Sequence, residues 1–102
     1  MKVQNMQSKH GNDVPNQFII SGTNEVGNFE VLQSYKSVIA KKQYGIKPAT
    51  VELDETYWDY SRTTSRYRNE FLGETKKETE AKIKSGEYKL VNLNLVNLNK
   101  DN

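Results

Sequence analysis

Residues 29–35 read Phe-Glu-Val-Leu-Gln-Ser-Tyr, and residues 36–42 follow with Lys-Ser-Val-Ile-Ala-Lys-Lys, without an intervening glycine or proline. Phe29, Val31 and Tyr35 share one face at a period of two, and Leu32 is the apolar exception on the other face, a pattern typical of a strand. The second run is rich in β-branched residues, which also favour strands. The two runs predict either neighbouring strands joined by a tight turn near residues 35–36, or one bent strand with a bulge.

Further strands are expected on both sides of this stretch. Phe18, Ile19 and Ile20 form a short apolar run that is followed by turn residues, and Val51 and Leu53 alternate with polar neighbours. The sequence therefore predicts a meander of three or four antiparallel strands over residues 17–54.

After residue 54 the apolar period moves closer to 3.6. Tyr67 and Phe71 stand four residues apart, and Gly73 is a helix stop, so we expect a short helix over about residues 64–72. Residues 75–78 match a capping box that begins a second helix, which Ser85 and Gly86 end. A last strand is expected within residues 87–94.

These elements predict an α+β fold: a small, mostly antiparallel sheet with one or two short helices packed on one face. The expected core draws on apolar residues from all of the elements, namely Phe18, Ile20, Phe29, Val31, Val38, Ala40, Val51, Leu53, Trp58, Tyr67, Phe71, Leu72, Ile83 and Leu90.

Both ends of the chain are polar or repetitive. Residues 1–16 are almost entirely polar and predict a flexible arm, which leaves residues 17–94 as a single domain. Residues 90–94 (Leu-Val-Asn-Leu-Asn) are repeated in residues 95–99. Because the repeat length is odd, equivalent residues of the second copy would face the opposite side of a strand. We therefore expect only the first copy to belong to the fold, and residues 95–102 to form a flexible tail.

Composition argues against catalysis. The chain of 102 residues has no cysteine, which excludes a disulfide framework, a thiolate metal site and a cysteine nucleophile. Its single histidine, His10, lies in the polar arm. Asp54, Glu55 and Asp59 form one acidic cluster at a strand end, which we interpret as structural rather than as a metal site. We expect no enzymatic activity, cofactor or metal, no membrane span, and a cytoplasmic location.

The positive charge is concentrated in one segment. The formal net charge is only +2, but residues 61–84 carry seven Lys or Arg against four Asp or Glu. Aromatic residues flank these cations. A positive field with aromatic stacking surfaces is typical of nucleic-acid binding. The alternative is a solvated helix face with the aromatic residues in the core.

The candidate site lies within residues 57–77. Residues 61–68 (Ser-Arg-Thr-Thr-Ser-Arg-Tyr-Arg) combine four hydroxyls at an expected helix start with three arginines, which is suitable for phosphate. The same residues could serve as helix caps, with Arg66 paired to Glu70. Trp58 is favoured as a core anchor. The candidate nucleic-acid or partner-binding residues are Tyr60, Arg62, Thr64, Arg66, Tyr67, Arg68, Lys76 and Lys77.

Two stretches carry a family resemblance: residues 33–35 with Ser37, Ile39 and Ala40, and residues 58–61 with Thr63, Thr64, Arg66, Tyr67, Phe71 and Leu72. Together they resemble short, uncharacterised early proteins of phages and mobile elements of lactococci and related Gram-positive bacteria. The resemblance spans about residues 17–94 and supplies no catalytic or binding residues. It implies a phage-derived protein that acts inside the bacterial host cell.

Two functions remain open from the sequence. The first is a non-enzymatic accessory protein that binds nucleic acid through residues 57–77. The alternative is a protein–protein inhibitor of a host enzyme, such as a defence nuclease, because Arg, Tyr and Trp dominate binding hot spots. A core this small also suggests a possible homo-oligomer formed through an edge strand.

Overall fold

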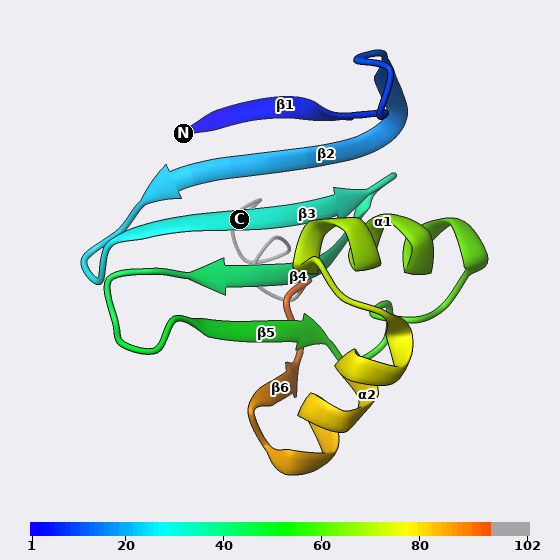
Figure 1. The fold of residues 1–102 in the computed structure, drawn as a ribbon. Coiled ribbons are helices and arrows are strands. Elements are labelled where there is room, and N and C mark those ends of the chain that lie inside the picture. Colours follow the sequence, from blue (N-terminus) through cyan, green and yellow to red (C-terminus); the bar gives the residue numbers. More distant parts are fainter. Residues whose placement is uncertain (95–102) are drawn as a thin grey trace.

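The computed structural model describes residues 1–94. These residues form a six-stranded sheet with two helices on one side, as Figure 1 shows. The strands lie in chain order: β1 (Lys2–Gln7), β2 (Asp13–Thr23), β3 (Asn28–Ser34), β4 (Ser37–Gln43), β5 (Thr50–Asp54) and β6 (Tyr88–Val91). Strands β1 to β5 are antiparallel, and β6 is parallel to β5. The predicted α+β fold is confirmed.

The helix α1 (Arg62–Leu72) ends where the sequence predicts but begins two residues before the expected start at about residue 64, and α2 (Lys76–Ser85) begins and ends as predicted. Ser61 caps α1 by accepting a hydrogen bond from the backbone amide of Thr64. Thr75 and Glu78 form the expected capping box of α2. Gly73 and Gly86 end the two helices in the left-handed conformation, which glycine adopts without steric cost.

The β3–β4 connection contains both features that the sequence left open. Tyr35 and Lys36 form a tight turn, with Tyr35 at a φ of 55°, and Ser34 pairs with Ser37. The register also shifts by one residue between Leu32 and Gln33, because Leu32 faces Ala40 whereas Gln33 faces Val38. The hairpin is therefore tight at its turn and bulged at Ile39.

The core lies between the sheet and the helices. Ile19, Leu32, Ala40 and Leu53 face one another across β2 to β5 and form an apolar row on this side. Leu32, Ala40 and Leu53 are completely buried. Phe71 of α1 belongs to the same cluster.

The prediction of which side of the sheet is buried was wrong for β2 and β3. Leu32, expected opposite the core, is at its centre, whereas Val31 is only half-buried on the other side. On β6, Tyr88 and Leu90 share the core side, but Tyr88 is buried whereas the predicted core residue Leu90 is exposed. Apolar residues occur on both faces of β2 and β3, so alternation alone does not identify the buried face. That choice depends on where the helices pack.

Residues 1–16, expected to form a flexible arm, instead supply β1 and the start of β2. Val3 pairs with Ile20 and Gln4 with Ile19 in the β1–β2 ladder. The Asn5 side-chain amide also donates to the Val14 carbonyl oxygen at 2.9 Å. An edge strand can be polar because backbone hydrogen bonds hold it in the sheet. The expected flexible tail, residues 95–102, lies outside the described residues.

Residues 92–94 follow β6 and form hydrogen bonds with residues of β4 and β5. The Asn94 side chain accepts from the Val38 backbone amide at 2.9 Å and donates to the Val38 carbonyl at 3.1 Å. The buried Asp54 carboxylate accepts from the backbone amide of Leu93. The first copy of the repeat therefore belongs to the fold, as expected. Within residues 1–94, no helix has the length and apolar character that crossing a membrane requires.

The assignment of the buried face leads to a stability prediction. Leu32→Ala should lower the free energy of unfolding by about 2–5 kcal/mol, because it opens a cavity in the core. Val31→Ala, one residue away on the other side, should cost much less. Urea denaturation of both variants measures the difference, and equal losses would contradict the assignment.

Candidate functional site

The candidate segment is organised around a buried arginine. Arg68 of α1 is completely buried, and its guanidinium lies 5.1 Å from the centre of the Trp58 ring. Its Nη1 donates to the Trp58 carbonyl oxygen at 2.5 Å and to Asp59 Oδ1 at 3.1 Å. Its Nη2 donates to Asn69 Oδ1 at 2.9 Å. A buried charge requires such partners, so this arginine attaches the loop before α1 to the helix.

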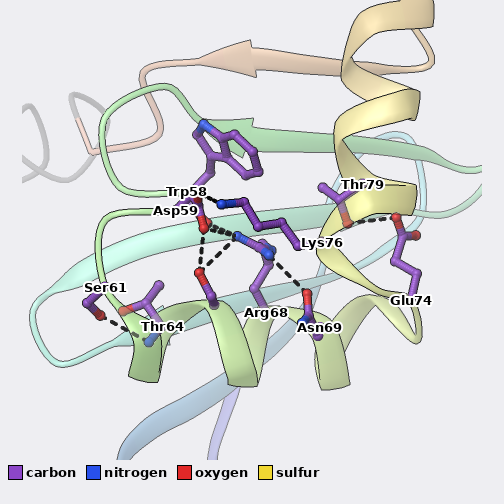
Figure 2. A network of polar contacts seen from close by, with 10 residues as sticks. Trp58, Asp59, Ser61, Thr64, Arg68, Asn69, Glu74, Lys76 and Thr79 are labelled. Atoms are coloured by element: carbon purple, nitrogen blue, oxygen red, sulfur yellow. Dashed lines mark hydrogen bonds and ion pairs between the residues drawn. The ribbon is translucent and has the colours of Figure 1, made fainter.

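Asp59 joins that loop to both helices, as Figure 2 shows. The hydroxyl of Ser65 and the guanidinium of Arg68 contact Oδ1, and Lys76 Nζ lies 2.8 Å from Oδ2. Burial alone would raise the pKa of Asp59, but hydrogen bonds from Lys76, Ser65 and Arg68 outweigh it and lower that pKa. The carboxylate is therefore held ionised.

A second polar cluster attaches α2 to β6. The Glu74 carboxylate accepts from Thr79 Oγ1 at 2.8 Å, from Lys82 Nζ at 3.1 Å and from the Tyr88 hydroxyl. Burial is the largest cause that raises the pKa of Tyr88 to about 12, and the hydrogen bond to Glu74 is the second. This cluster fixes the position of α2, and with it the position of Lys76.

An open hollow lies at the start of α1. It has a volume of about 360 Å³ and is lined by Asp59, Tyr60, Ser61, Arg62, Ser65 and Lys76. The first turn of α1 carries no acidic side chain of its own, and Asp59 is the one carboxylate among the residues that line the hollow. Within residues 1–94, Arg62 forms no ion pair. We call this feature the α1 hollow.

The structure separates the predicted site residues into exposed and buried groups. Tyr60, Arg62 and Lys76 meet at the α1 hollow. Arg66 and Lys77 are exposed but do not line it, and the Arg66 side chain lies 3.9 Å from that of Glu70. Tyr67 is half-buried.

Two of the predicted binding residues are unable to contact a partner. Thr64 and Arg68 are completely buried. The Thr64 hydroxyl lies 3.2 Å from that of Ser34 beneath α1, and the guanidinium of Arg68 is enclosed by Trp58 and Asp59. Including them was wrong because charge and hydroxyl content do not indicate which side of a helix faces the sheet.

Asp54 and Asp59 of the acidic cluster form structural contacts within residues 1–94. The carboxylate of Asp54 accepts from the backbone amides of Thr56, Tyr57 and Leu93, and Asp59 binds Arg68 and Lys76. No group of three or more potential metal-ligating side chains occurs within residues 1–94.

Sequence reasoning missed the connecting roles of Asp59 and Glu74. Both carboxylates accept from residues on other elements, at separations of up to 17 and 14 residues respectively. Local patterns contain no signal for such pairings. Trp58, favoured as a core anchor, does pack against the core.

The family assignment rests on residues 1–87, which match the model of a family of unknown function (DUF8033). The chain belongs to that family. The match includes β1, which indicates that the polar N-terminal segment is part of the family's domain. No curated protein and no solved structure matches the chain.

Arg68 and Arg66 provide a matched test of the buried network. Arg68→Ala should lower the free energy of unfolding by about 3–5 kcal/mol, because it leaves the Trp58 carbonyl and Asp59 without a buried donor. Arg66→Ala on the exposed side should change it by less than about 0.5 kcal/mol. Thermal and urea unfolding measure both variants, and similar losses would rule out a structural role for Arg68.

Proposed function

We propose that the chain is a non-enzymatic, phage-type accessory protein that binds nucleic acid at the α1 hollow. The observation that carries the proposal is the convergence of Tyr60, Arg62 and Lys76 on one open surface. Two cations, Arg62 and Lys76, line the hollow with the single carboxylate of Asp59, which Arg68 also contacts, so positive charge is in excess there. Such an excess attracts phosphate groups, which supply most of the affinity for nucleic acid.

Tyr60 is the candidate stacking residue. Its side chain is 49% exposed, whereas Trp58 and Tyr67 are partly buried. Tyr57 meets the Tyr60 ring edge-to-face with the ring centres 5.2 Å apart, which supports the ring from one side. A supported, exposed ring can stack on a base of any sequence.

The exposed cations extend this surface along the helices. Arg66 stands on the exposed side of α1 with its side chain 73% exposed, and Lys77 lies in the first turn of α2. Arg68 contributes charge without contact, since its side chain is buried. Binding therefore depends on Tyr60 and Arg62 at the centre of the surface, with Arg66, Lys76 and Lys77 around it.

Binding to a labelled single-stranded oligonucleotide of mixed sequence, followed by fluorescence anisotropy, tests the proposal. The affinity should fall steeply as salt rises, and Arg62→Ala should weaken it several-fold and reduce the salt slope by about one unit. Tyr60→Ala should weaken binding more than Tyr60→Phe, which keeps the ring. Lys47→Ala, on the exposed β4–β5 loop, is the control. A salt-independent affinity would contradict the proposal.

Inhibition of a host enzyme is the second candidate, because exposed tyrosine and arginine are also typical of protein-binding hot spots. Native protein and a Tyr60→Ala/Arg62→Ala double variant would be used as baits in nuclease-treated bacterial lysate. A host enzyme retained by the native chain, lost by the double variant and inhibited in purified form would favour this candidate. Retention that disappears after nuclease treatment favours nucleic acid instead.

A further inference from the structure

The side of the sheet opposite the helices is apolar on strands β1 to β3 and charged on strands β4 to β6. One row of cross-strand neighbours runs through all six strands there: Val3, Ile20, Val31, Lys41, Glu52 and Lys89. On β4 to β6 the row alternates in charge, which suits a surface in contact with water. On β1 to β3 it consists only of β-branched apolar residues.

Within residues 1–94, the apolar half of this row ends at a sheet edge that no other strand covers. Val3 lies on β1, the first strand of the sheet, and is 61% exposed. Along an edge strand, backbone amides and carbonyls without a neighbour favour pairing with another strand. β1 contains no proline, and Lys2 is its one charged residue. The edge is therefore suited to pair with a strand that continues the apolar row.

We propose that β1 pairs with β1 of a second copy of this chain, antiparallel, around a two-fold axis at Val3. In this register Val3 faces Val3 of the second copy, Lys2 faces Gln4, and Met1 faces Asn5. Each pair lies on one side of the sheet, since residues two apart share a face. The apolar rows of the two copies then join into a single row across the interface.

Two features of β1 select this register. The β1–β2 ladder is regular from Lys2 to Asn5 and becomes irregular between Asn5 and Gln7. Pairing around Val3 uses residues 1–5 and avoids the irregular part. It also keeps the two Lys2 side chains apart, because each faces a neutral glutamine rather than the other lysine.

The chemistry of the two edges favours β1 with β1 over a head-to-tail contact with β6. β6 is four residues long, and its position in the open-side row is occupied by Lys89. Pairing β1 with β6 would bring the apolar end of one row against the charged end of another. It would also leave a free β1 at one end and a free β6 at the other, and each could pair with a further copy, so that assembly would continue into filaments instead of closing as a dimer.

Val3→Lys and Val3→Glu test the proposal, because residue 3 of each copy faces residue 3 of the other copy across the axis. Sedimentation velocity over a range of concentrations should show a dimer of the native chain. Each variant alone places like charges face to face and should raise the dimer dissociation constant by about tenfold or more. An equimolar mixture of the two should recover a dimer, because lysine then faces glutamate.

Val26→Lys is the matched control, since Val26 is 50% exposed on the β2–β3 loop and away from the β1 edge. This control should dimerise like the native chain, and circular dichroism checks that all variants are folded. A native chain that stays monomeric at millimolar concentration, or grows beyond a dimer, overturns the proposal. So does unchanged dimerisation of Val3→Lys, or a mixture that fails to recover the dimer.

Discussion

Burial of the Arg68 guanidinium is the interaction on which the arrangement of the helices depends. Moving a cation out of water costs several kcal/mol unless hydrogen bonds and an opposite charge offset the loss. Here the Trp58 carbonyl, Asp59 and Asn69 supply those contacts. Asp59 in turn binds Lys76, so one buried arginine fixes the loop after β5, the face of α1 and the start of α2. The exposed residues of the α1 hollow take their positions from this network.

Much of the element order could be predicted because its signals are local. The caps at Ser61 and Thr75 and the helix ends at Gly73 and Gly86 each depend on a few adjacent residues. Side-chain hydrogen bonds to free helix amides and glycine's tolerance of positive φ act over three or four positions. A single sequence contains these signals in full.

The buried faces and the site residues depend on contacts that are distant in sequence. Leu32 and Val31 are both apolar, and the packing of α1 on β3 decides which of them is buried. Arg66 and Arg68 are chemically the same, yet two positions along a helix place one in water and the other beneath Trp58. β1 was missed because a polar strand has no apolar alternation, although its backbone pairs as well as any other. Composition located the cationic segment, but the fold determined which of its cations are accessible.

The two proposals are linked by geometry. A two-fold axis between antiparallel strands of one sheet runs perpendicular to that sheet, so a β1–β1 dimer keeps the helices of both copies on the same side. The two α1 hollows would then lie on the same side of the joined sheet. A single hollow with a small excess of positive charge holds only a short stretch of nucleic acid, whereas two hollows on one side can bind one strand together. Once the strand occupies the first hollow, its effective concentration at the second is high, so avidity would strengthen binding without any additional contact.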